Sequence, residues 1–350
     1  LPISSLSFPP VYSTMVLVTG KSIGVAALSC VVLCSLVHVC MADNATQAAS
    51  PIASLIDSLT NFDFGTENPY RVFNKWVNSF FFSDAFVKAI ENKLNNEEAS
   101  YYLVCYFRDF IAGSAVYWIT GSVWHFFIYT MYGEEIFTKN GRPFPSSATL
   151  KHQMTLSQLA IFVYASLPVL SEYIIESGYT KTYFYISDIG GWQNYFKWLF
   201  VYVCCFEMGI YWAHRKLHTV KFLYKYLHST HHQYNKWETM TPWASIAFNP
   251  FDGMLQAASY LLFLPVVPVH YFTHIFLLFF SGIWATNIHD SVPMNSEPLM
   301  GAAYHAIHHT HYHYNFGQWF IFCDYLFGTL RSRQDLEDMR AAAEEAKKSK

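Results

Sequence analysis

Charged residues are scarce in this chain. Asp, Glu, Lys and Arg together make up 13% of its 350 residues, about half the share found in soluble domains. The 22 Lys and Arg residues are balanced by 25 Asp and Glu. No dense basic surface is visible, so we expect no nucleic acid partner.

Cysteine is sparse and shows no paired metal-binding spacing. There are seven cysteines, an odd number, and most lie in apolar stretches: Cys30, Cys34, Cys40, Cys105, Cys204, Cys205 and Cys323. Buried, reduced thiols explain this distribution better than a disulfide framework.

Apolar and aromatic residues are abundant, at 53% and 19% of the chain. They gather into long stretches that predict membrane-spanning helices at about 110–131, 154–175 and 195–213. The apolar block 254–288 is too long for one span, and Pro265 and Pro268 predict a helical hairpin there. Arg108 and Asp109 are expected at the mouth of the first span, and Pro168 is expected to kink the second. The predicted fold class is an all-α integral membrane protein with several transmembrane helices.

The chain divides into four predicted regions. Residues 1–40 form an N-terminal extension, either a signal or anchor segment or upstream sequence translated in error, since Met41 resembles a natural start. A polar region follows at 41–100, the membrane-embedded domain at 101–331 and an exposed charged tail at 332–350.

Basic residues are concentrated in loop 133–153, segment 214–253 and the tail. The positive-inside rule places these three segments in the cytosol. Lys347 and Lys348 stand where a dilysine retrieval signal would stand, which predicts the endoplasmic reticulum membrane; an ordinary solvated charge run is the alternative.

Histidine is the unusual residue, with 16 copies. Half of them fall into an HxxxH box and two HxxHH boxes, all on the predicted cytosolic side. Residues three or four apart share a helix face, so each box is expected to aim two or three imidazoles the same way. With His289 at the end of the hairpin, the candidate metal ligands and catalytic residues are His214, His218, His228, His231, His232, His289, His305, His308 and His309.

Nine imidazoles suit a pair of metal ions with four or five ligands each. We expect His270, His274, His311 and His313 to lie outside this cluster. The acids Glu207, Asp252, Asp290 and Asp324 are candidates to hold the ligand imidazoles in place, with helix caps or surface acids as the alternative.

At these residues the chain resembles the fatty acid hydroxylase superfamily of membrane di-iron enzymes, and within it the sterol C5-desaturases, or lathosterol oxidases, of the plant Δ7-sterol C5(6) type. The resemblance covers about 100–331. Its closer motifs are 207–212, 223–228, 247–256, 283–290, Asn315-Phe316-Gly317 and Asp324. Asn249, Phe316 and Pro293 depart from the family pattern; Pro293 stands where plant relatives carry a second histidine after His289.

The resemblance implies an O2-dependent oxidoreductase with two iron ions. It would introduce the C5–C6 double bond into a Δ7-sterol taken from the bilayer. Electrons would come from cytochrome b5 and its NAD(P)H-dependent reductase.

Three other functions stay open on the residues alone. A sterol C4-methyl oxidase or a fatty acid or carotenoid hydroxylase would use the same boxes, because no motif distinguishes desaturation from hydroxylation. A histidine-rich metal transporter is a remote alternative, since its ligands should lie at the membrane midplane. A metal-free structural protein is the least favoured.

Overall fold

The computed structural model describes residues 67–290, 292 and 297–348. The predictions for residues 1–40 and for the lysines that end the chain fall on residues or side chains outside this description. The described part is helical apart from two short strands, β1 (Thr182–Tyr183) and β2 (Val269–His270), which pair in parallel. The predicted all-α class is therefore confirmed.

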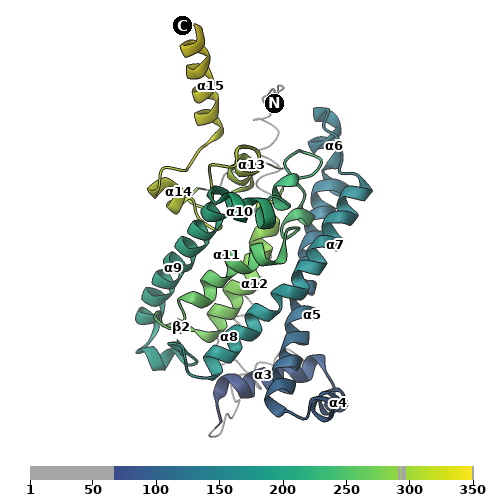
Figure 1. Ribbon diagram of the computed structural model, residues 1–350, viewed down its shortest axis with the longest axis vertical. Helices are drawn as coiled ribbons and strands as arrows, with labels where there is room; N and C mark the ends of the chain where they lie inside the picture. The colour runs from purple at the N-terminus through teal and green to yellow at the C-terminus, as the bar shows by residue number, and fades with distance from the viewer. Residues whose placement is uncertain (1–66, 291, 293–296, 349–350) are drawn as a thin grey trace, which may run out of the picture. The chain divides into compact units, whose positions relative to one another are not determined.

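Four helical segments of the described residues are long and apolar enough to cross a membrane. They are Glu97–Met131, made of α5 (Glu97–His125) and a π-helical turn; Ser147–Glu176, made of α7 (Ser147–Tyr164) and α8 (Ser166–Glu176); α9 (Trp192–Thr219); and α12 (Tyr271–Ile288). With α11 (Pro250–Leu262) they pack as neighbouring, roughly aligned rods (Figure 1). The loop between α11 and α12 contains Pro265 and Pro268, as the predicted hairpin required.

The other α-helices of the described residues are shorter than the four candidate spans. They are α3 (Pro69–Phe81), α4 (Asp84–Leu94), α6 (Gly133–Ile136), α10 (Lys221–Leu223), α13 (Ala302–His311), α14 (Phe322–Leu326) and α15 (Arg333–Lys348). Asn68 and Ser83 cap α3 and α4, because their side-chain oxygens accept hydrogen bonds from the first free backbone N–H groups. Both helices pack against α5.

The predicted kink in the second span is present at Ala165, between α7 and α8. Proline cannot donate a backbone hydrogen bond, and its ring crowds the carbonyl four residues earlier. For Pro168 that carbonyl belongs to Tyr164, the last residue of α7. The break therefore falls where the proline chemistry requires it.

The first span differs from the prediction because α5 begins at Glu97, well before residue 110. Arg108 and Asp109 are consequently inside the helix and buried, not at its mouth. Arg108 forms ion pairs with Asp109 and with Glu172 on α8, and it donates a hydrogen bond to Asn78. Glu172 is far from Arg108 in sequence, so the charges of Arg108 and Asp109 alone predicted the end of a helix.

Replacing Arg108 by methionine is expected to lower the free energy of unfolding by about 3–5 kcal/mol, because two buried carboxylates lose their counterion. The matched control is Arg71→Met, which breaks the partly exposed pair with Glu98 and should cost about 1 kcal/mol or less. Thermal unfolding in detergent would measure both. Equal shifts for the two variants would contradict a compensating role for Arg108.

Candidate metal centre

The first histidine box lies on the last turns of α9. His214 and His218 are four residues apart and face the same direction. The Nδ1–H of His214 donates to the carbonyl oxygen of Phe316 at 2.9 Å, which turns its Nε2 inward. The Nε2 atoms of His214 and His218 are both buried and have no hydrogen-bond partner within the described residues.

The second box does not form one α-helix. It runs through a π-helical turn, Tyr224–His228, and a 3-10 turn, His231–Gln233. His228 is fully buried, and its Nδ1–H donates to Asp252 Oδ2 on α11 at 2.7 Å.

The third box lies on α13 and meets His289, the residue that ends α12. His308 Nδ1–H donates to the carbonyl of Tyr314 at 2.8 Å, and His289 Nδ1–H donates to the carbonyl of Ala285 at 2.7 Å. In both residues Nε2 is the atom left to face the neighbouring imidazoles.

All nine candidate histidines come together in two groups. The ligand nitrogens of each group lie within 4.8 Å of one another. One group contains His214, His218, His228, His232 and His308; the other contains His231, His289, His305 and His309. Their role as metal ligands stays a prediction, but the structure places every one of them where that role requires.

The expectation that each box aims two or three imidazoles the same way is confirmed for two histidines of each HxxHH box. His228 and His232 belong to one group and His231 to the other, while the third box sends His308 one way and His305 and His309 the other. Adjacent residues on a helix point about 100° apart. The paired histidines of a box therefore diverge, and each HxxHH box bridges the two groups.

The spacing of facing nitrogens fits ligands of a shared ion. An imidazole nitrogen lies about 2.1 Å from a first-row metal such as zinc, so two ligands at a right angle are about 3.0 Å apart. The Nε2 atoms of His289 and His305 are 2.9 Å apart, and those of His228 and His232 are 3.1 Å apart. A shared proton could join one such pair, but it would leave the unpartnered Nε2 atoms of His214, His218 and His308 unsatisfied.

Burial favours the neutral form of several candidate ligand histidines outside the membrane spans. Burial, followed by the neighbouring imidazoles, holds the pKa of His231, His305, His308 and His309 well below the ordinary value. Burial lowers the pKa of His289 to about 4. A neutral imidazole keeps a lone pair, so these side chains suit a metal ion.

Of the four acids considered as supports, Asp252 contacts a candidate ligand directly. Glu207 does not: its Oε1 accepts three backbone N–H groups, from Gln318, Trp319 and Phe320. Asp324 accepts the N–H groups of Phe316 and Gly317. These two acids therefore hold the loop that carries the Phe316 carbonyl, and they act on His214 through that loop.

The other described histidines are outside both groups, as expected for four of them. His274 is buried between Ser171 and Tyr202, and His270 contacts the carbonyl of Phe184. His311 and His313 are at least partly exposed at the end of α13. His125 and His152 contact Trp243 and Tyr234.

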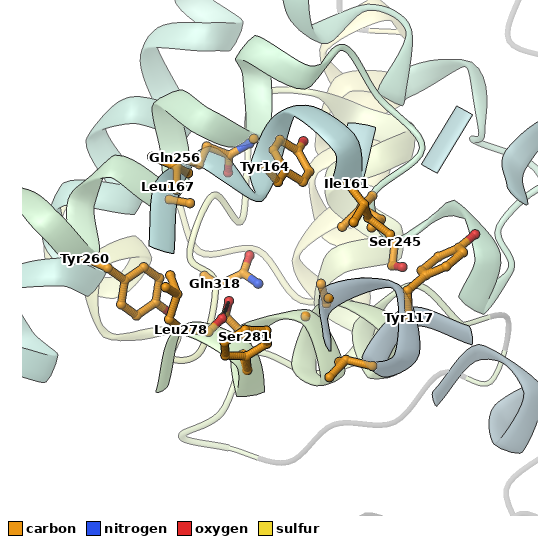
Figure 2. Close-up of a pocket in the computed structure, with 18 of the residues that line it drawn as sticks. Tyr117, Ile161, Tyr164, Leu167, Ser245, Gln256, Tyr260, Leu278, Ser281 and Gln318 are labelled. Atoms are coloured by element: carbon orange, nitrogen blue, oxygen red, sulfur yellow. Dashed lines mark hydrogen bonds between the residues drawn. The ribbon is translucent and has the colours of Figure 1, made fainter. Parts of the chain in front are cut away.

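A cavity of about 210 Å³ opens beside the histidines. His214, His231, His289 and His305 line one part of it, and mainly apolar side chains of the membrane helices line the rest. Figure 2 shows Ile161, Leu167 and Leu278 around this space, with a few polar side chains between them. A long apolar molecule could therefore reach the imidazoles from within the helices.

Comparison with known proteins agrees with this arrangement. The fatty acid hydroxylase family model matches residues 199–329. A Δ7-sterol C5(6)-desaturase of Nicotiana tabacum is 44% identical over 64% of this chain and 82% of its own length. This chain belongs to the sterol C5(6)-desaturase family.

A second plant member of the family, from Arabidopsis thaliana, is 42% identical over 67% of this chain and 83% of its own length. The lathosterol oxidase of Rattus norvegicus is 35% identical over 49% of this chain and 58% of its own length. No solved structure matches the chain.

Sequence reasoning missed the backbone carbonyls that orient this desaturase-family centre. Those of Ala285, Tyr314 and Phe316 accept from ligand imidazoles, and a carbonyl leaves no trace in residue identity. The cavity-lining residues other than the histidines were also missed, because they come from six separate helices and from the loops around 245–248 and 318. Only their apolar character was visible in the sequence.

Proposed function

We propose that this protein is a Δ7-sterol C5(6)-desaturase of the endoplasmic reticulum membrane. The observation that carries the proposal is the apolar cavity that ends on four inward-facing imidazoles. A sterol is apolar over nearly its whole surface, and the cavity is lined mainly by apolar side chains of the membrane helices. The membrane domain, 101–331, would contain the whole reaction site.

The residues present fit a pair of iron ions, one for each histidine group. The donors are all imidazoles, which suit iron. Four of them donate their second nitrogen to a carboxylate or carbonyl, as metal-bound histidines do. When bound and reduced, two iron ions would supply the O2 activation needed to remove hydrogen from C5 and C6.

The protein's own side chains would place the sterol and exclude water. His214, His231, His289 and His305 line the cavity, so the reacting carbons would lie against them. Apolar residues such as Ile161 and Leu278 would surround the rings. In the balanced reaction, the sterol loses two hydrogens and O2 takes up these together with two electrons and two protons, giving the Δ5,7-diene and two waters.

We propose that cytochrome b5 and its reductase supply the electrons on the cytosolic side. The basic residues Arg215, Lys216 and Lys221 adjoin the first histidine box, and they would meet an acidic electron-transfer partner. The positive-inside rule places this end of α9 in the cytosol. Solvated juxtamembrane charge is the alternative explanation of these residues.

Complementation of a yeast strain that lacks its own C5-desaturase would test the proposed function. Expression of the full chain is expected to restore Δ5,7-sterols, measured by gas chromatography–mass spectrometry. A product two mass units lighter than the Δ7-sterol indicates desaturation, and one sixteen units heavier indicates hydroxylation. Unchanged Δ7-sterols, with the protein expressed and membrane-bound, would contradict the proposal.

Asp252→Asn is expected to weaken metal binding by about 10–100-fold, the usual effect of losing the partner of a ligand imidazole. The Asp252 carboxylate accepts from both His228 and Gln256, and an amide cannot accept as strongly from both. Competition with a chelator would measure metal retention by the purified protein. Asp188→Asn, which caps a short turn outside both histidine groups, is the control. Equal retention by the two variants would contradict this role of Asp252.

A further inference from the structure

The cavity contains one side-chain amide with no protein partner. Gln318 lines the cavity, and within the described residues its amide group makes no hydrogen bond. Its backbone is held firmly: its N–H donates to Glu207 Oε1 at 3.0 Å, and its carbonyl accepts from Trp284 Nε1 at 2.9 Å. Figure 2 shows the amide end of Gln318 pointing into the space between the labelled side chains.

Apart from the histidines, most other polar side chains along the cavity are already occupied; the exceptions are Asp109 and the Tyr164 hydroxyl, which is buried against the backbone of Gly253. The Tyr117 hydroxyl donates to the carbonyl of Trp243, and the Ser281 hydroxyl donates to that of Leu278. The hydroxyl of Ser245 accepts from Thr286, and Gln256 donates to Asp252. An amide left free in such a cavity is suited to a polar group on the ligand.

Gln318 lies close enough to the histidine groups for one end of a sterol to contact both. It bonds Glu207, which is seven residues before His214 on α9, and Trp284, which is five residues before His289 on α12. At the rise of an α-helix these separations are about 10 and 8 Å. A sterol carries its hydroxyl on C3, with only C4 between C3 and C5. A partner for that hydroxyl must therefore lie close to the site where C5 and C6 react.

Asp109 is the competing candidate, because its Oδ2 is buried, unpartnered and beside the same cavity. Asp109 lies at the end of the cavity that is far from the histidine groups. Val116 on α5 packs against Gly282 on α12; Asp109 is seven residues before Val116, and His289 is seven residues after Gly282. Since α5 and α12 run in the same direction, Asp109 is about 20 Å from His289 along the helices. A hydroxyl bound there would hold C5 and C6 far from the imidazoles.

We propose that the Gln318 amide binds the 3β-hydroxyl of the sterol and so positions C5 and C6 at the histidine groups. The hydroxyl can donate to the amide oxygen and accept from the amide nitrogen. This inference rests on the proposed function for the identity of the substrate.

The test compares a Δ7-sterol with its 3-deoxy analogue on the purified, metal-loaded protein, by kcat/KM and by quenching of tryptophan fluorescence on binding. The wild type is expected to prefer the hydroxyl-bearing sterol by about 10-fold or more, equivalent to about 1.4 kcal/mol. Gln318→Met, which keeps the length of the side chain, should remove most of this preference. In this variant kcat/KM and affinity should fall for the hydroxyl-bearing sterol and change little for the analogue.

Gln158→Leu is the matched control, because the Gln158 amide bonds Ser114 and Trp118 and does not line the cavity. It should keep the wild-type preference. If Gln318→Met folds poorly, Gln318→Asn gives the same test, since the shorter side chain withdraws the amide. A wild-type preference retained in the Gln318 variants would overturn the inference. Hydroxyl-selective binding that depends on Gln318, without turnover of either sterol, would support the inference and count against the proposed function.

Discussion

Replacing His231 by alanine is expected to reduce Δ5,7-sterol formation at least about 100-fold. Changes to groups that only support ligand histidines already cost about 10–100-fold, and His231 lies within a group itself. It belongs to the group of four, lines the cavity and places its Nε2 3.1 Å from that of His289. Its loss leaves three imidazoles for that ion, so metal content should fall from about two ions per chain toward one.

Elemental analysis of the purified variant would measure the metal, and the yeast assay would measure the product. His152→Ala is the control, because His152 is exposed and contacts only Tyr234 among the residues that the structure describes. It should retain both ions and full activity. Two ions and normal sterols in the His231 variant would show that the two groups are wrongly assigned.

The fold was predictable wherever a local pattern determines it. Apolar stretches predicted the spans, and Pro168 predicted the break found at Ala165. Pro265 and Pro268 predicted the loop between α11 and α12. The start of α5 was not predictable in this way. Arg108 and Asp109 are buried within α5 because Glu172, on another helix, completes their charge balance, and such a long-range partner has no local signature.

The histidine site shows the same division. Spacing and residue type identified all nine imidazoles that the structure brings together. Their sorting into two groups was not visible, because it depends on the π-helical and 3-10 turns of the second box and on where α12 delivers His289. Glu207 differs from the prediction for a related reason: it contacts no candidate ligand imidazole directly, because its partners are backbone N–H groups of a distant loop.

Glu207 stabilises the loop that supports the site, and this role can be tested. One carboxylate oxygen holds three consecutive N–H groups, at 2.9–3.0 Å, from residues 318–320. The preceding residues of the loop present the Phe316 carbonyl to His214. Gln318 itself is the residue that we propose to bind the sterol hydroxyl. One acid on α9 therefore fixes a candidate ligand histidine and the proposed sterol-binding residue at the same time.

Glu207→Ala is expected to lower the free energy of unfolding by about 5 kcal/mol, because three partly buried N–H groups lose a charged acceptor at roughly 1.5–3 kcal/mol each. Hydrogen exchange at Gln318, Trp319 and Phe320 should accelerate before the rest of the protein opens, and thermal unfolding would measure the total loss. Glu207→Gln separates the two properties of the side chain, since its amide oxygen still accepts but carries no charge. It should keep the three hydrogen bonds at the lower strength of a neutral acceptor, and so lose less amide protection and less bound metal than the alanine variant. If the alanine and glutamine variants lose protection equally, the carboxylate stabilises the loop by its charge, and the three hydrogen bonds contribute little.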